Sequence, residues 1–255
     1  MKKIAIFLIS LLLSFQGSVV AYAGLSDIKK ESLPKTTRLS DESYDDLMKR
    51  ADLMKRAEAG DTDAQLGLGF LYIQGEGVTK DKKKAAELFA KAAKKGSVEA
   101  QYNLGLLYCE GDSFEEKSRG IKLLKKAAEQ DFDIMFVHPS LILGLMYSKA
   151  EKEIGLPLSM YENTINCVDE NKEEAVKWFN KSAKKNSTAK FYLGYMYENG
   201  YGVDQDIDKA IDLYTEVAII DGNVWAMLRL VKLYDKGESV PVIGNYCDKS
   251  PDFCK

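Results

Sequence analysis

The sequence Leu68-Gly69-Phe70-Leu71-Tyr72 is one copy of a five-residue motif, Leu-Gly-x-x-Tyr, that recurs along the chain. Further copies occupy residues 104–108, 143–147 and 193–197, and a fifth copy at 230–234 keeps the leucine and tyrosine but lacks the glycine. Successive copies begin about 36 to 50 residues apart, which is the range of periods found in stacked helical repeats. The motif therefore predicts a solenoid rather than a domain built around a single core.

The first copy shows why the motif suits a helix. Ala64, Leu68 and Tyr72 are spaced by four residues and so share one face of a helix. Gly69 lies beside that face and has no side chain, so a neighbouring helix can approach closely. The sequence predicts a first helix that buries this stripe.

A second helix is predicted over residues 84–95. The preceding segment, Gly75-Glu76-Gly77-Val78, supplies two glycines that can adopt positive φ, and Asp81 is a suitable N-cap. Its small residues Ala85, Ala92 and Ala93 allow close helix packing, Leu88 and Phe89 fill the volume between repeats, and the helix is expected to stop at Gly96. The basic unit is thus a helix-turn-helix.

This alternation resembles the Sel-1-like repeat family, whose members are relatives of tetratricopeptide repeat proteins. The resemblance covers roughly residues 48 to 237 and implies an all-α fold, a right-handed α/α superhelical solenoid of helix-turn-helix repeats. The first repeat carries the family's anchor residues at Ala64, Leu68, Gly69, Tyr72, Gly75, Gly77, Val78, Asp81, Ala85, Phe89, Lys91, Ala92, Ala93 and Gly96. The fourth carries Ala189, Leu193, Gly194, Tyr197, Gly200, Gly202, Val203, Asp206, Lys209, Ala210 and Tyr214.

The N-terminus has the features of a secretory signal peptide. Lys2-Lys3 precede an apolar run from Ile4 to Phe15, and Ala21-Tyr22-Ala23 places small residues before a cleavage site. A membrane anchor is the alternative, although the apolar run is short for a span. Cleavage after residue 23 would leave 34 basic against 39 acidic side chains, a formal charge of −5. An acidic chain argues against general nucleic-acid binding.

The rest of the chain divides by composition and repeat register. Residues 24–43 are expected to form a flexible lead, followed by a capping helix at 44–60 whose Lys-Arg pairs are interpreted as a solvated face. The repeats are placed at about 61–96, 97–131, 136–186 and 187–222, with a half-repeat at 223–237 inside a solenoid of 44–237. A turn-rich tail with two cysteines follows at 238–255, and we expect it to cover the last helix.

The third repeat contains an insertion of about 15 residues within 149–171, by comparison with the first repeat. The segment is too apolar for a simple spacer. It is interpreted either as a binding loop or as a segment that folds back on its own repeat, since insertions in solenoids map to one edge. Its candidate partner-binding residues are Leu156, Leu158, Met160 and Tyr161.

The four cysteines, Cys109, Cys167, Cys247 and Cys254, favour disulfides in an exported chain. In the repeat geometry that the resemblance implies, Cys109 and Cys167 fall on the same edge of adjacent repeats. We therefore predict two pairs, Cys109 with Cys167 and Cys247 with Cys254. The spacing does not suit zinc, because there is no Cys-x-x-Cys.

No pattern of residues points to catalysis, a metal or a cofactor. The chain lacks the serine-hydrolase, zinc-protease and phosphate-loop motifs. Asp204-Gln205-Asp206 begins like a calcium loop, but Lys209 and Thr215 stand where a glycine and a bidentate glutamate are needed. His138 is the only histidine and precedes Pro139, so a structural role is favoured. The protein is expected not to be an enzyme.

The expected function is that of an exported scaffold that binds another protein in the periplasm or outside the cell. Sel-1-like proteins are generally adaptors, and exported ones include immunity proteins that neutralise secreted antibacterial effectors such as phospholipases. The specific hypothesis is an immunity or inhibitor protein. The alternatives are a host-interaction or envelope adaptor, and an enzyme of the cysteine-rich, β-lactamase-like type described for some relatives.

The resemblance also implies a concave groove lined by fixed positions of each first helix. Exposed aromatic residues there are typical binding hot spots. The alternative is that superhelical winding, the N-terminal lead or the insertion buries them. The groove residues are Leu66, Phe70, Ile73, Tyr102, Leu106, Leu141, Leu145, Phe191, Tyr195 and Leu228.

Overall fold

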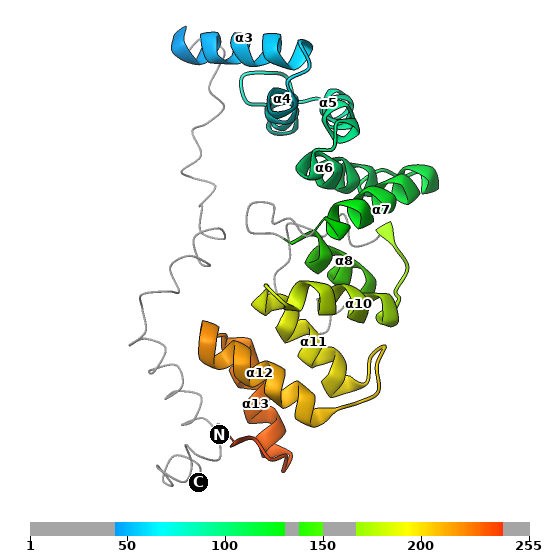
Figure 1. The fold of residues 1–255 in the computed structure, drawn as a ribbon, viewed down its shortest axis with the longest axis vertical. Coiled ribbons are helices and arrows are strands. Elements are labelled where there is room, and N and C mark those ends of the chain that lie inside the picture. Colours follow the sequence, from blue (N-terminus) through cyan, green and yellow to red (C-terminus); the bar gives the residue numbers. More distant parts are fainter. Residues whose placement is uncertain (1–43, 131–137, 150–166, 242–255) are drawn as a thin grey trace. The chain divides into compact units, whose positions relative to one another are not determined.

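The computed structural model describes residues 44–130, 138–149 and 167–241, and over these residues the fold is all-α (Figure 1). They belong to two compact units, one ending at Ala210 and one that begins at Ile211. The predicted signal peptide (1–23), the lead (24–43), most of the insertion and most of the tail lie outside the described residues. Each unit is considered by itself below.

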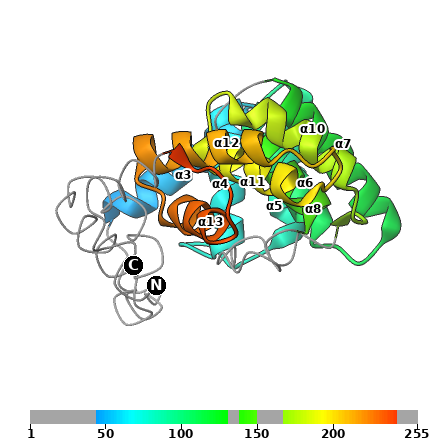
Figure 2. The same ribbon diagram turned by 90° about the horizontal axis from the view of Figure 1, so that it is seen from below.

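The larger unit is a succession of short helices that pair with their neighbours. Each helix packs against the next one along the chain, and α8 also contacts α11. Figure 2 shows the same helices from below, after a turn of 90°. The helices are α3 (Tyr44–Glu58), α4 (Thr62–Gln74), α5 (Lys82–Lys94), α6 (Val98–Cys109), α7 (Phe114–Glu129), α8 (Pro139–Ser148), α10 (Lys172–Ala183) and α11 (Ser187–Asn199).

The second unit contains most of α12 (Ile207–Asp221), which begins in the larger unit, and all of α13 (Val224–Asp235). The buried stripe of α12 includes Ala210, Tyr214 and Val217. In α13, Ala226, Leu230 and Leu233 are buried at the spacing expected for one helix face. Val240, beyond the end of α13, is also buried.

Turn chemistry explains where the helices begin and end. Asp81 accepts hydrogen bonds from the backbone N–H groups of Lys83 and Lys84, as predicted for an N-cap. Gly75 and Gly77 have φ values of 79° and 64°, the left-handed conformation anticipated for that turn. At six other helix starts a side chain accepts a hydrogen bond from the backbone N–H of the residue three positions later. These N-caps are Asp61, Ser97, Ser113, Asn171, Asn186 and Asn223.

The motif glycines permit close contact between paired helices. A Cβ atom on Gly69 would lie 2.4 Å from Cε1 of Phe89, and one on Gly144 would lie 2.5 Å from the ring of Phe179. Both phenylalanines are fully buried. In these two repeats a ring of the second helix therefore occupies the space that the glycine of the first helix leaves open. In the second repeat Leu124 takes that place, since a Cβ atom on Gly105 would lie 2.8 Å from its Cγ.

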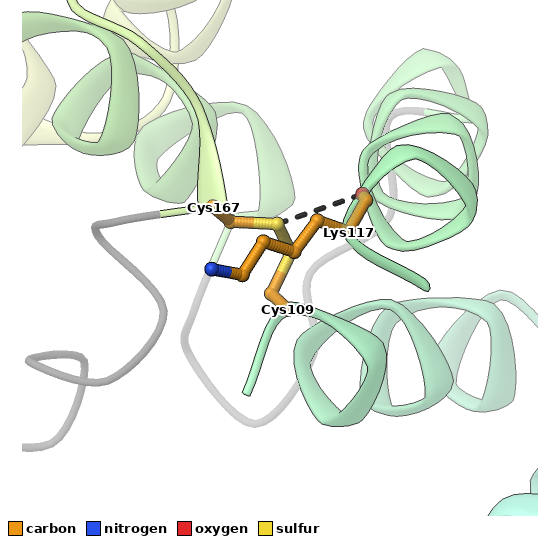
Figure 3. Close-up of a disulfide and its surroundings, with 3 residues drawn as sticks. All are labelled: Cys109, Lys117 and Cys167. Atoms are coloured by element: carbon orange, nitrogen blue, oxygen red, sulfur yellow. Dashed lines mark hydrogen bonds between the residues drawn. A yellow bond between two sulfur atoms is a disulfide. The ribbon is translucent and has the colours of Figure 1, made fainter. Parts of the chain in front are cut away.

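A disulfide joins Cys109, the last residue of α6, to Cys167, which precedes α10 (Figure 3). This is the first of the two pairs expected from the sequence; Cys247 and Cys254 lie outside the described residues. The carbonyl oxygen of Lys117 lies 3.6 Å from Sγ of Cys167. Because an oxidised sulfur carries no proton, this is a close contact rather than a hydrogen bond.

Candidate protein-binding surface

Half of the predicted groove residues are buried, so the expectation that water reaches them is wrong. Every residue of α8 is buried, because this helix packs against α7, α10 and α11. The ring of Phe191 lies edge-on to Tyr192, and Tyr195 lies edge-on to Tyr201. The buried groove residues are Tyr102, Leu141, Leu145, Phe191 and Tyr195.

Most of the other groove residues are half-buried. Leu66, Phe70 and Ile73 pack against the core formed by Ala85, Phe89 and Leu104, and the rings of Phe70 and Phe89 have centroids 5.4 Å apart. Leu106 is also half-buried. Leu228 differs from all of these, since it is 47% exposed. The inserted-loop candidates Leu156, Leu158, Met160 and Tyr161 lie outside the described residues.

The end of each second helix provides a common register for comparing repeats. In the first and third repeats a buried pair, Ala92-Ala93 or Ser182-Ala183, is followed by two exposed lysines, Lys94-Lys95 or Lys184-Lys185. In the second repeat the exposed pair is Glu129-Gln130. The two positions that follow the buried pair are therefore polar and exposed in all three of these repeats.

The fourth repeat breaks this pattern. After its buried pair, Val217-Ala218, come Ile219 and Ile220, which are 64% and 70% exposed. Burying an isoleucine is worth about 2 kcal/mol relative to leaving it in water. Two adjacent isoleucines at positions that the other repeats fill with polar side chains are therefore unlike the normal scatter of exposed apolar residues.

The first turn of α13 extends this apolar surface. Only Gly222 and Asn223 separate α12 from α13, so Ile220 and Val224 are close in the chain. Trp225 is 43% exposed, and Leu228 follows it on the same side of the helix, one turn later. The name C-terminal apolar patch is used below for Ile219, Ile220, Val224, Trp225 and Leu228.

Trp225 also departs from the register of the repeats. Counted back from the motif leucine, its equivalents in the first, second and fourth repeats are Asp63, Glu99 and Thr188, all polar. The exposed large apolar residues elsewhere in the described chain, Met48 and Phe114, lie on separate helices. Single exposed residues need no special explanation, whereas a cluster of five suggests a binding surface.

The groove hypothesis missed four of these five residues. It followed only the first helix of each repeat, so Ile219 and Ile220 were outside its reach. An alignment of the ends of the second helices would have identified Ile219 and Ile220 from the sequence alone. In that alignment the pair occupies the positions of Lys94-Lys95 and Lys184-Lys185. The signal is an apolar pair at a register position that is otherwise polar.

The perturbed carboxylates of the larger unit have structural explanations. Burial opposes ionisation of Glu174, but the ammonium groups of Lys125 and Lys177 and the indole N–H of Trp178 outweigh it and lower its pKa. Burial, with a smaller contribution from Asp63, raises the pKa of Glu99. His138 is buried at the entry to α8.

The described residues show neither a metal-binding cluster nor a membrane-spanning helix. They contain no group of three or more His, Cys, Asp or Glu side chains placed to hold a metal ion. None of the helices described here is both long and apolar enough to cross a membrane.

Comparison with known proteins identifies the repeats. The model of the Sel1 repeat matches residues 62–97, 98–132, 148–187 and 187–218, together more than half of the chain. The chain belongs to the Sel1 repeat family. The fold class predicted from the resemblance, an all-α Sel1 repeat solenoid, is confirmed.

Solved Sel1 repeat proteins share the fold. The chain is 26% identical to a Sel1 repeat protein from Oxalobacter formigenes, with a TM-score of 0.58 over 78% of this chain and 53% of that one. It is also 26% identical to c5321, a protective antigen of uropathogenic Escherichia coli strains, with a TM-score of 0.56 over 81% of this chain and 42% of the antigen.

A curated relative is the rat protein DAP3-binding cell death enhancer 1. The two sequences are 35% identical over an alignment of 207 residues that covers 78% of this chain. The chain spans 36% of that relative's length. The relative's name describes binding to another protein, in keeping with the role of Sel1 repeats in protein–protein interaction.

Proposed function

We propose that this Sel1 repeat protein is a non-catalytic scaffold that binds another protein through its C-terminal apolar patch. The observation that carries the proposal is the presence of Ile219 and Ile220 at two register positions that are polar and exposed in the other repeats, together with the exposed Trp225 nearby. Interface hot spots are enriched in tryptophan at the centre of apolar clusters. The half-buried groove residues Leu66, Phe70, Ile73 and Leu106 are secondary candidates.

The site of action in this proposal is the periplasm or the outside of the cell. Three features support it: the signal-peptide pattern of residues 1–23, the disulfide between Cys109 and Cys167, and the acidic balance of the remaining chain. Disulfides persist in oxidising compartments and are rare in the cytosol.

The specific role proposed is an immunity or inhibitor protein that neutralises a secreted antibacterial effector, for example a phospholipase. Inhibition by occlusion requires a binding surface and no catalytic group. An adaptor in the envelope or in host interaction is the second candidate, since c5321 is named as a protective antigen of a pathogen.

The experiment is site-specific photo-crosslinking in the native cell. A photoreactive phenylalanine analogue at position 225 is compared with the same analogue at position 184, an exposed site of the third repeat. We expect an adduct with one partner protein from position 225 and none from position 184. Absence of any adduct from position 225 would refute binding at the patch.

A double substitution provides the matched control. Ile219→Lys with Ile220→Lys reproduces the lysine pair found in the first and third repeats, so the fold should tolerate it. The variant should lose the partner while keeping the helicity and melting temperature of the parent. Lys184→Ala with Lys185→Ala, at the same register in the third repeat, should keep the partner.

A further inference from the structure

The second helices of the first three repeats are basic, whereas the first helices are not. Five lysines and one glutamate give α5 a net charge of +4, and five basic and three acidic side chains give α7 a net charge of +2. α10 has three lysines and two glutamates, a net charge of +1. The first helices α4, α6 and α8 have net charges of −1, −1 and 0. The largest positive charge of the six is therefore that of α5.

The charge of α5 is not explained by the helix itself. The stretch Lys82-Lys83-Lys84 fills its first turn, and that turn contains no acid after the N-cap Asp81. The helix dipole disfavours cations at this end and favours acids, such as Glu115-Glu116 in the first turn of α7 and Glu173-Glu174 in that of α10. Lysines at the start of α5 therefore need a reason outside the helix.

Three lysines of α5 face solvent on one side of the helix. Lys83, Lys91 and Lys94 are exposed, and their spacing directs them away from the buried Ala85 and Phe89. Within the part of the chain that the structure describes, these three ammonium groups make no ion pair or hydrogen bond. They are free to meet an anion from outside the chain.

α7 continues this arrangement in the second repeat. Lys126 directly precedes the buried pair Ala127-Ala128, as Lys91 directly precedes Ala92-Ala93, so the two lysines have the same register. Lys122 lies one turn before Lys126; both are exposed, and neither makes an ion pair with another described residue. The name lysine surface is used below for Lys83, Lys91, Lys94, Lys122 and Lys126.

The carboxylates on the solvent side of α5 and α7 do not cancel this charge. Glu115 pairs with Arg119, which is not part of the lysine surface, with an N–O distance of 2.6 Å. The exposed Glu87 and Glu129 remain. Five lysines thus stand against two carboxylates, and the surface has a positive surplus.

The composition of the lysine surface favours a lipid bilayer over a protein as its partner. Protein interfaces are enriched in aromatic residues, methionine and arginine and are depleted in lysine. Within the described chain, α5 exposes no large apolar side chain and α7 exposes only Phe114, its first residue. A lysine ammonium group is a hydrated point charge that needs no fixed partner geometry. Clusters of such charges bind anionic lipid headgroups.

We infer that the lysine surface binds the anionic headgroups of a phospholipid bilayer and holds the protein at the membrane periphery. Each lysine near such a surface strengthens binding by about fivefold. The surface lies in the larger unit, so this inference does not depend on the C-terminal apolar patch.

Co-sedimentation with lipid vesicles tests the inference on the full mature chain. One set of vesicles is phosphatidylcholine alone, and the other is an equal mixture of phosphatidylcholine and phosphatidylglycerol. At low salt the protein should bind the mixture and not phosphatidylcholine alone. Rising salt should release it, because the Debye length shortens.

A triple substitution locates the binding to the lysine surface. Lys83→Gln, Lys91→Gln and Lys94→Gln combined should weaken binding to the mixed vesicles by about a hundredfold at low salt. The matched control makes the same change in net charge at three exposed lysines of other segments and should bind as the parent does. Circular dichroism should show parental helicity and melting for both variants. The control substitutions are Lys55→Gln, Lys232→Gln and Lys236→Gln.

Several outcomes would overturn the inference. They are equal binding to both kinds of vesicle, binding to neither, parental binding by the Lys83, Lys91 and Lys94 variant, and an equal loss in the control variant. Binding to soluble polyglutamate without binding to vesicles would assign the surface to an acidic protein segment and also overturn it. The proposed function fails separately, through the absence of a crosslinked adduct from position 225, which the vesicle experiment does not involve.

Discussion

Cys109 and Cys167, separated by 58 residues in the sequence, are joined by a disulfide that links the second repeat to the third. Cys109 is 1% exposed at the end of α6, and Cys167 lies just ahead of α10. The bond therefore ties the segment just before α10 to the preceding repeat.

This disulfide should be a large part of the stability of the larger unit. For a loop of 58 residues the chain-entropy model gives about 4 kcal/mol. Cys109→Ala with Cys167→Ala should lower the free energy of unfolding by an amount of that order, measured by urea denaturation. The parent should lose a similar amount on adding a reductant.

Two comparisons check the disulfide prediction. The double alanine variant should lose no further stability on reduction at this bond. Cys247→Ala with Cys254→Ala removes a pair predicted to close a much shorter loop, and should cost less, about 2.5 kcal/mol. Equal stability of the parent and the Cys109 and Cys167 variant would show that the bond contributes nothing.

The two glycines of α4 predict opposite effects of the same substitution. Gly69→Ala places a Cβ atom 2.4 Å from the ring of Phe89, which is buried and cannot move freely, so we expect a loss of about 1 to 3 kcal/mol. Gly67→Ala meets only the methyl groups of Leu53, at 3.6 Å. Alanine has the better helix propensity, so that variant should be neutral or more stable by up to about 1 kcal/mol.

Thermal unfolding followed by circular dichroism measures both glycine variants. The pair controls for helix propensity, because both residues lie within the same helix, two positions apart. If Gly69→Ala were as stable as Gly67→Ala, the close contact with Phe89 would not be the reason for the motif glycine.

The sequence was sufficient for the fold because the repeats supply several independent signals. Gly69, Gly75 and Asp81 each serve one local function, close packing, a left-handed turn and a helix cap, and the structure shows all three. Recurrence of the same signals at a fixed spacing then determines how neighbouring helices pair.

The binding surface was less predictable because exposure depends on neighbours outside the repeat. Tyr102 and Phe191 occupy the same register position as Leu228, yet the first two are buried and Leu228 is exposed. The register gives the direction of a side chain, whereas the helices around it decide whether water reaches it. Ile219 and Ile220 were detectable, since their equivalents in the other repeats are polar in the sequence itself.

Glu174 should make the stability of the larger unit depend on pH. Its carboxylate lies 3.5 Å from Nζ of Lys125 on α7 and accepts a 3.1 Å hydrogen bond from Nε1 of Trp178. The pKa of Glu174 is lower in the folded state than in the unfolded chain, where it is near 4.5. The ionised carboxylate therefore stabilises the fold fully above that unfolded-state pKa, and this stabilisation is lost as the pH falls through the pKa of the folded state.

Glu174→Gln keeps the oxygen that accepts from Trp178 and removes the charge. The variant should be less stable than the parent by at most about 1 kcal/mol at pH 7, because the ion pair is partly exposed. The difference should shrink between about pH 5 and pH 3. Glu173→Gln, its exposed neighbour, is the control, and a constant difference across that range for Glu174→Gln would contradict the assignment.

Tyr195 and Trp225 should respond in opposite ways to truncation, which separates core from binding surface. Tyr195 is 5% exposed and packs edge-on against Tyr201, so Tyr195→Ala should cost about 3 to 5 kcal/mol of stability. Trp225 is 43% exposed, so Trp225→Ala should cost much less in stability while weakening partner binding by at least tenfold, about 1.4 kcal/mol. Urea denaturation and titration with the crosslinked partner measure the two effects. The opposite outcome would show that the partner binds the predicted groove and not the C-terminal apolar patch. In that case Tyr195→Ala would fold but fail to bind the partner, and Trp225→Ala would still bind it.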